Sequence, residues 1–521
     1  MYKYIKEATR NWLGSHNIEL SMELHILLLL ITLSLLPTII LRRRQKNRPP
    51  GPPGLPIIGN LHQLGPKPHA TLSTLSKTYG PLMSLQLGSV TVVIASSPSA
   101  AQEILQKHDS SFSDRPIPDA ITAQPNVLDT LAWSPGGPRW RSRRRLCTTK
   151  IFTAQRLDLL QHLRQHKVQQ LVQHLHQKSA ARTPVNIGDL AFATMLNLVS
   201  NTVFSEDVVD PEFKSAGEFK EVVWRIMEDA GKVNASDYFP AVKWLDLQGI
   251  KRHVRVSYLR IHKLFDEMIG KRVSYRDTCA ARGDDFLDVL LDHCQHHQHD
   301  DSEDSDPLTI DNIKPMLLDL FIAGSDTSGS TIEWAMAELL HNPETMQKAR
   351  KELNQVIGTT NNEVKESDIP KLEYIQAIVK ETLRLHPPVP LLLPYVAGND
   401  VEVGGYTIHK GDQVLINAWS IGRDPQFWDD PMVFQPERFL GSKIDFKGRD
   451  FEFLPFGAGR RICPGLALAN RMITLAVAAL VHSFEWKLPE GVTPESLDMT
   501  EQYGITLKRL SPLCALPISV Y

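Results

Sequence analysis

One short run constrains this chain more than any other: residues 456–465, with the sequence Phe-Gly-Ala-Gly-Arg-Arg-Ile-Cys-Pro-Gly. A single cysteine, Cys463, stands there among glycines, which let a backbone turn sharply and approach a flat group closely. Arg461 supplies a fixed cation that can pair with a haem propionate, and Phe456 can shield the sulfur from water. A thiolate held in this way against haem iron donates electron density that favours O–O cleavage. We therefore expect Cys463 to determine the chemistry of the chain.

A lone cysteine beside a glycine turn is more often a buried structural residue, so the spacing has to decide between the two interpretations. The run satisfies every defined position of Phe-x-x-Gly-x-Arg-x-Cys-x-Gly, which is the signature of cytochromes P450. From Pro49 to its C-terminus the chain resembles that superfamily. The resemblance implies a mainly α P450 fold with a small β region, and haem b with Cys463 as the axial thiolate.

Length and composition narrow the organisation of the chain. Its 521 residues would by length alone suggest about three domains, but motifs from Trp140 to Cys463 must converge on one cofactor, which favours one large domain, 57–521. The net charge of −2, from 57 basic and 59 acidic residues, gives no global field that attracts nucleic acid. Five cysteines, odd in number and widely spaced, indicate a reducing compartment.

The N-terminal region predicts a membrane anchor. Residues 24–41 are mostly apolar, and 18 helical residues reach roughly 27 Å, close to the ~30 Å hydrocarbon thickness of a bilayer. The arginines at 42–44 follow this run and favour a cytosolic location for the rest of the chain. A cleaved signal peptide is the alternative, but no small-x-small cleavage site follows. We expect an N-terminal extension, 1–23, whose start at Met1 or Met22 stays open, and an anchor with its basic flank, 24–44.

Residues 45–56 are rich in proline, which fixes φ and removes backbone donors, so the segment is expected to be a stiff hinge rather than a helix. A generic disordered linker is the alternative. Beyond the hinge, short alternating runs at 82–87 and 90–94 predict strands. Long amphipathic patterns at 156–177 and 313–340 predict helices.

The resemblance implies that a basic segment around residue 140 contacts the haem. Trp140 and Arg144 lie four residues apart on one helical face and match the Trp-x-x-x-Arg pattern, whose ends reach the haem propionates. Five other basic residues of this segment are candidates for docking an acidic reductase, unless they form an ordinary solvated face: Arg139, Arg141, Arg143, Arg145 and Lys150.

A second diagnostic run, 323–328, fits the family pattern Ala/Gly-Gly-x-Asp/Glu-Thr-Thr/Ser. Leu320, Ala323 and Thr327 share one helical face, and Ala323 is small enough to leave room above an iron. The resemblance implies that Thr327 hydrogen-bonds the bound oxygen and that Asp326 relays protons from solvent; the alternative is a purely structural pair. Pro315, upstream in the same helix, predicts a kink or a late start.

Glu381 and Arg384 lie three residues apart and can pair on one helical face. By resemblance, Arg438 is the third member of a structural Glu-Arg-Arg network behind the haem.

The prolines of 386–394 predict an extended strand, which in the family lines the substrate pocket. The residues expected at this pocket are apolar: Leu320, Val389, Leu391, Leu392 and Ile505. The chain departs from the family at Tyr395, where relatives commonly place Arg or His against a propionate, so one haem contact is expected to be weaker or differently made.

Within the superfamily, the segments 237–240, 246–252 and 333–340 resemble the plant clade that includes geraniol hydroxylases and diterpene oxidases. The resemblance implies a monooxygenase of the endoplasmic reticulum membrane that uses O2 on a small apolar metabolite, a terpenoid above all. Electrons would come from NADPH through a separate NADPH-cytochrome P450 reductase. The alternatives are a phenolic or alkaloid oxidase, a haem-thiolate isomerase or dehydratase that does not use O2, and a non-catalytic haem carrier.

Overall fold

The structure is a computed structural model that describes residues 47–210, 212–279, 285–296, 308–359 and 363–520. The predicted extension 1–23, the anchor 24–44 and the first two residues of the hinge lie outside the described residues. The helices are α2 (Pro68–Tyr79), α3 (Pro98–Gln102), α4 (Pro138–Lys150), α5 (Ala154–Leu159), α6 (Gln161–Ala180), α7 (Ile187–Phe204), α8 (Ala216–Gly231), α9 (Ala235–Tyr238), α10 (Ile250–Cys279), α11 (Phe286–His296), α12 (Ile310–His341), α13 (Pro343–Val356), α14 (Glu373–Leu385), α15 (Ala418–Ile421) and α16 (Leu466–Ser483). Short helical turns that matter below are η2 (Glu103–Lys107), η5 (Pro240–Leu245), η8 (Pro436–Phe439) and η9 (Gly459–Arg461). The strands are β1 (Leu82–Leu87), β2 (Val90–Ala95), β3 (Val185–Asn186), β4 (Tyr395–Val396), β5 (Val401–Val403), β6 (Tyr406–Ile408), β7 (Gln413–Ile416), β8 (Phe484–Lys487), β9 (Glu501–Tyr503), β10 (Leu507–Arg509) and β11 (Cys514–Ser519).

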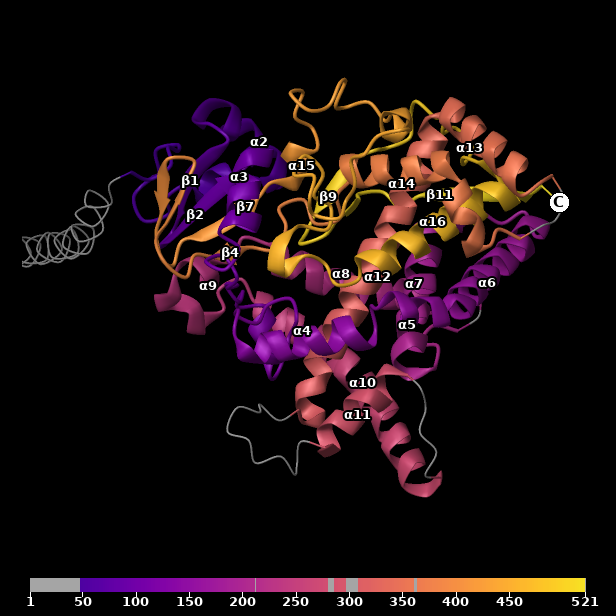
Figure 1. Cartoon of the computed structure of the whole chain (residues 1–521), viewed down its shortest axis with the longest axis horizontal. Helices are drawn as coiled ribbons and strands as arrows, with labels where there is room; N and C mark the ends of the chain where they lie inside the picture. The colour runs from indigo at the N-terminus through magenta and orange to yellow at the C-terminus, as the bar shows by residue number, and fades with distance from the viewer. Residues whose placement is uncertain (1–46, 211, 280–284, 297–307, 360–362, 521) are drawn as a thin grey trace, which may run out of the picture.

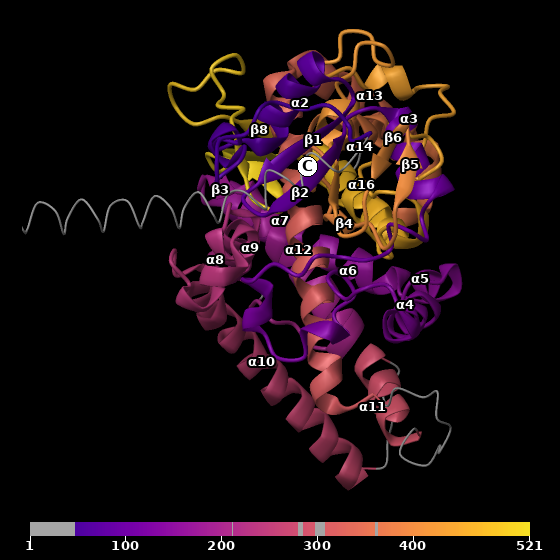
Figure 2. The same cartoon turned by 90° about the vertical axis from the view of Figure 1, so that its left-hand side faces the viewer.

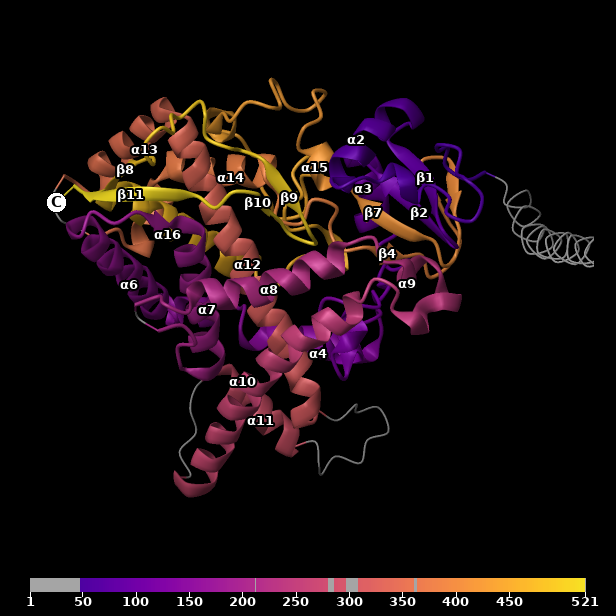
Figure 3. The ribbon, with the colours of Figure 1, turned by 180° about the vertical axis from the view of Figure 1, so that it is seen from behind.

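The central element is α12, a helix of 32 residues that passes through the middle of the molecule (Figure 1). It packs against α7, α16 and α14, and its C-terminal half is buried almost all round. Seen from behind, α7 and α8 lie beside it (Figure 3), while α10 and α11 lie at the end of the molecule farthest from α13 (Figure 2). The mainly helical fold predicted from the sequence is therefore confirmed.

The start of α12 differs from the prediction. A capping box between Thr309 and Asn312 begins the helix at Ile310, so the late start expected from Pro315 is wrong. Proline removes the amide that would bond the carbonyl of Asp311, four residues earlier. The side-chain amide of Asn126 donates to that carbonyl at 3.3 Å instead, which satisfies the group that Pro315 leaves free.

The small β region is also confirmed, and its main sheet lies at one end of the molecule (Figure 1). The strand order is β1-β2-β7-β4, with β2 and β7 parallel and the other pairs antiparallel. The first predicted strand has the expected bounds, and the second extends by one residue to Ala95, which pairs with Leu82.

Two predicted elements take another form. The helix expected at 156–177 is divided into α5 and α6 at Leu160. The strand expected at 386–394 is wrong: the amide of Leu392 donates to the carbonyl of Val389 at 3.1 Å, and Leu392 has a φ of +50°. A tight turn therefore precedes β4, because the prolines exclude helix without requiring an extended chain.

Within the described ranges, two helices are long and apolar enough to cross a membrane, α7 and α16. Their apolar windows are 89% and 61% buried inside the protein, as expected for core helices, so they are weak evidence for a span. The anchor expected at 24–41 stays a prediction.

Candidate functional site

Cys463 lies in a closed loop between η9 and the first turn of α16. Its amide donates to the carbonyl of Phe456 at 3.0 Å, which closes the loop of the signature run. Burial raises the pKa of the Cys463 thiol, while the amides of Gly465 and Leu466 and the charge of Arg144 oppose this shift. The loop therefore presents one sulfur at the start of a helix, where backbone amides favour the thiolate.

One glycine of this loop, Gly459, is required by the packing of the protein itself. Gly459 has a φ of +66°, and a Cβ there would lie 1.9 Å from the carbonyl oxygen of Leu105 in η2. This glycine is required by the close approach of two backbone segments, a role that the sequence did not indicate.

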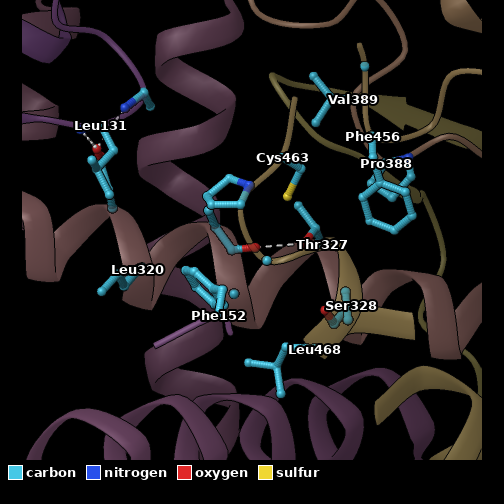
Figure 4. A pocket seen from close by; sticks show the side chains of 18 of the residues that line it. Leu131, Phe152, Leu320, Thr327, Ser328, Pro388, Val389, Phe456, Cys463 and Leu468 are labelled. Atoms are coloured by element: carbon cyan, nitrogen blue, oxygen red, sulfur yellow. Dashed lines mark hydrogen bonds between the residues drawn. The ribbon is translucent and has the colours of Figure 1, made fainter. Parts of the chain in front are cut away.

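Above Cys463 lies a cavity whose walls come from α4, α7, α12, α16 and the turn before β4. Figure 4 shows Phe456 and Cys463 around it together with Leu320 and Thr327 of α12. The wall is largely apolar, with Leu198 and Val199 of α7 on one side and Leu468 of α16 on another. The cavity joins the cysteine to the helix that carries the second diagnostic run.

Three arginines, Arg115, Arg144 and Arg461, line this cavity, and in the described part of the chain none of them forms a salt bridge. Burial lowers the pKa of all three, and in Arg461 the neighbouring charge of Arg115 contributes to a value of about 9. Cations gathered without carboxylate partners are costly unless an anion joins them. The donor set therefore fits a ligand with more than one negative charge.

Backbone carbonyls hold these arginines in place, Arg461 and Arg144 among them. Arg461 donates to the carbonyls of Ser113 at 2.9 Å and Ser134 at 2.6 Å, and its guanidinium lies 3.9 Å from the ring centre of Trp140. Arg144 donates to the carbonyl of Ile462, next to the cysteine. The two predicted residues of α4 and Arg461 are thus brought together.

Arg115 is a cation of this cavity that the sequence analysis missed. It donates to the carbonyls of Leu393 and Pro394, and its guanidinium stacks on Tyr395, 4.0 Å from the ring centre. Among the described residues, its buried Nε has no hydrogen-bond partner. The sequence held one signal for this residue. Relatives commonly place Arg or His at position 395, so Tyr395 indicated that another residue supplies the cation, and Arg115 lies against that position.

On α12, Ala323 and Thr327 line the cavity, as does Gly324. The Thr327 hydroxyl donates to the carbonyl of Ala323 at 2.6 Å, and the helix is continuous here. Asp326 does not line the cavity: it is buried and accepts a 2.5 Å hydrogen bond from the hydroxyl of Thr506. Burial raises the pKa of Asp326, opposed by Thr506 and the charges of Lys220 and Lys508.

The three residues expected behind the haem also meet. Arg384 donates to both carboxylate oxygens of Glu381, at 2.7 and 2.8 Å, and Arg438 donates to the same carboxylate at 3.0 Å. Glu381 and Arg384 have fully buried side chains, which is consistent with a structural network.

The expected pocket residues divide into two groups. Leu320, Val389 and Leu392 line the cavity, whereas Leu391 and Ile505 do not. Leu391 packs into a separate core beneath β1 and β2, because the turn at 389–392 sends its side chain the other way. Ile505 instead bonds through its amide to the carbonyl of Met227 in α8.

Comparison with known proteins identifies a family that uses this arrangement. The family model described as Cytochrome P450 matches residues 49–513. Geraniol 8-hydroxylase of Catharanthus roseus is 48% identical over 493 residues, covering 94% of this chain and 98% of the relative. Drimenol monooxygenase of Persicaria hydropiper is 45% identical over 499 residues, covering 96% of this chain and 98% of the relative. The 7-ethoxycoumarin O-deethylase of Helianthus tuberosus is 46% identical over 475 residues, covering 91% of this chain and 95% of the relative.

Proteins of this family bind haem b through a cysteine thiolate. The residues present fit that group: Cys463 can supply the thiolate, and the three arginines, which pair with no carboxylate of the described residues, can receive two propionates. The chain belongs to the cytochrome P450 family and is a haem-thiolate monooxygenase.

Proposed function

We propose that this chain is a membrane-anchored monooxygenase that inserts one atom of O2 into a C–H bond of a plant terpenoid. The observation that carries the proposal is that one cavity, with a largely apolar wall, is lined by Cys463 together with Ala323 and Thr327. Such a wall excludes water and orients a substrate by shape. The relatives that act on geraniol and drimenol support a terpenoid, and the ethoxycoumarin relative keeps a phenolic ether as the second candidate.

Haem, when bound, supplies the activation of O2, and the chain's own residues supply the rest. Cys463 would hold the haem through its thiolate, and Arg115, Arg144 and Arg461 would hold the propionates. Thr327 keeps its proton directed at the Ala323 carbonyl, so its oxygen can accept a hydrogen bond from the cavity side. Asp326 would move protons only by leaving Thr506, and Lys220 and Lys508 lie near enough to influence its charge.

Electrons are proposed to arrive from NADPH through a reductase that docks beside α4. Arg141, Arg145 and Lys150 are exposed there, whereas Arg143 is buried against Asp129 at 3.1 Å and is not available. Because Arg144 of the same helix bonds the carbonyl next to Cys463, a partner on this face would lie near the metal ligand. Complementary charge speeds such transient encounters.

Attachment to the endoplasmic reticulum membrane is proposed from the sequence of 24–44 and from an exposed apolar surface. Its six residues come from the end of the hinge and the two residues after it, and from η5 and the loop that follows η5: Leu55, Ile57, Ile58, Trp244, Leu245 and Leu247. The β1–β2 hairpin contacts the first group and the helix α9 that precedes η5, since Gly88 donates to the carbonyl of Ile58 and Ser89 to that of Tyr238. Trp244 is 81% exposed, which suits an aromatic residue at a lipid interface.

Expression in microsomes with and without a plant reductase tests the proposal. The expected result is a thiolate carbon monoxide spectrum, and oxygenated product from a panel of terpenoids that includes geraniol, formed only with NADPH and reductase. Product from a phenolic ether alone would favour the second candidate. Turnover without NADPH would establish an isomerase or dehydratase, and the spectrum without any product would indicate a haem carrier.

A further inference from the structure

Asp319 is the one carboxyl among the described residues that line the cavity. Its Oδ2 accepts two backbone hydrogen bonds, from Leu131 at 2.6 Å and from Ala132 at 2.9 Å. Both of those residues line the cavity as well, and Asp319 itself is only half-buried. One oxygen is thus fixed by the wall while the residue still opens onto the cavity.

The surroundings of Asp319 leave its charge uncompensated. In the described ranges no Lys, Arg or His pairs with it, and the two amides are its only hydrogen-bond donors. Burial raises the pKa of this carboxyl to about 7, although the two amides oppose the shift. A carboxyl in an apolar wall is costly unless something donates to its remaining lone pairs.

Holding the loop that contains Leu131 and Ala132 explains only part of the role of Asp319. The carbonyl of Leu131 accepts from Trp140 at 3.1 Å and from Arg461 at 3.3 Å, so the loop held by Asp319 also supports the cationic wall. An amide oxygen would accept the same two backbone bonds as well as a carboxylate does. The second carboxylate oxygen is therefore left for another partner.

The position of Asp319 along α12 sets where that partner would lie. Ala323 follows it by four residues and Thr327 by eight, which is roughly 6 Å and 12 Å along the helix axis. All three line the same cavity. A molecule anchored at Asp319 would extend along the helix and present its far end near Ala323 and Thr327.

We infer that Asp319 binds a hydroxyl group of the substrate, which makes the substrate a terpenoid alcohol that is oxidised at the end remote from its hydroxyl. The inference rests on the proposed function and narrows it. The ionised carboxylate can accept a hydrogen bond but not donate one, so it selects an alcohol over both the parent hydrocarbon and the methyl ether.

The test measures binding of three probes to the haem-loaded full chain at pH 8, by the substrate-induced absorbance shift. The probes share one carbon skeleton: geraniol, its methyl ether and the hydrocarbon 2,6-dimethylocta-2,6-diene. The wild type should bind geraniol at least about tenfold more tightly than either of the others, as expected for a hydrogen bond to a charged acceptor. Asp319→Asn keeps an acceptor for Leu131 and Ala132 but turns an NH2 donor toward the cavity. In this variant the preference of geraniol over the ether should fall toward one.

The matched control is Asp311→Asn on the exposed part of the same helix, which should keep both wild-type ratios. An unchanged geraniol-to-ether ratio in Asp319→Asn would overturn the inference and leave Asp319 with the loop alone. Equal binding of all three probes by the wild type would also overturn it, while keeping the terpenoid assignment. A wild type that binds none of them and forms product only from a phenolic ether would refute the proposed terpenoid substrate itself.

Discussion

Replacing Glu381 by Gln removes the negative charge of a fully buried ion pair with little change in volume. Arg384 makes two bonds to this carboxylate, at 2.7 and 2.8 Å, and neither side chain is exposed to solvent. The remaining donors of Arg384 bond the carbonyls of Gly422, Pro431 and Val433. The guanidinium is therefore held in place after the carboxylate charge of Glu381 is removed. Leaving one partner of a buried pair unpaired costs about 3–5 kcal/mol.

The lower end of this range is expected, because Gln still offers one carbonyl oxygen to Arg384. About 3 kcal/mol corresponds to a rise of roughly 150-fold in the unfolded fraction. Urea unfolding of the solubilised holoprotein, followed by the haem absorbance and by tryptophan fluorescence, measures the change in free energy. Trp428 is a suitable reporter, since the Arg384 guanidinium lies 5.3 Å from its ring centre.

The matched control breaks an exposed ion pair on the surface. Lys348 and Glu437 are 2.6 Å apart, but their side chains are 56% and 33% exposed, so Lys348→Gln should cost less than about 1 kcal/mol. A loss of less than 1 kcal/mol in Glu381→Gln, equal to this control, would refute the reasoning that the network is dry and structural. Product formed per remaining haem should stay close to the wild-type value, because the pair lies away from the cavity.

Three further changes test the site. Thr327→Ala should lower the product formed per NADPH consumed while NADPH oxidation continues, measured by parallel product and cofactor assays; preserved coupling would contradict a role for its hydroxyl. Arg115→Ala should release haem roughly tenfold faster to an apomyoglobin acceptor, because a charge-assisted bond to a propionate is lost; an unchanged rate would mean that Arg115 serves the loop alone. The double variant Arg141→Glu and Arg145→Glu should raise the reductase concentration that gives half-maximal activity, most clearly at low salt. The same requirement as in the wild type would place reductase docking elsewhere.

Local sequence was sufficient for the features that depend on neighbouring residues. The spacing of Cys463 and Arg461, the helical face shared by Ala323 and Thr327, and the first strand at 82–87 all follow from short-range geometry. The pairing of Glu381 with Arg384 is of the same kind, because residues three apart meet on any helix.

Sequence spacing did not predict which side chains point into the cavity. Leu391 and Leu392 are adjacent and equally apolar, yet only Leu392 reaches the cavity, since the turn before β4 sends the two side chains to different cores. Asp326 fits the family pattern, but contact with Thr506, 180 residues later in the chain, turns it away from the cavity.

The sequence by itself determined the family and the class of reaction, because these reside in contiguous motifs whose residues act together over a few positions. Only the tertiary structure decided that Arg115 lies against Tyr395 and that Asp319 lines the cavity above Cys463. The surroundings of both residues come from segments far away in the sequence. Packing of the whole fold brings such distant segments together, and no local sequence pattern indicates it.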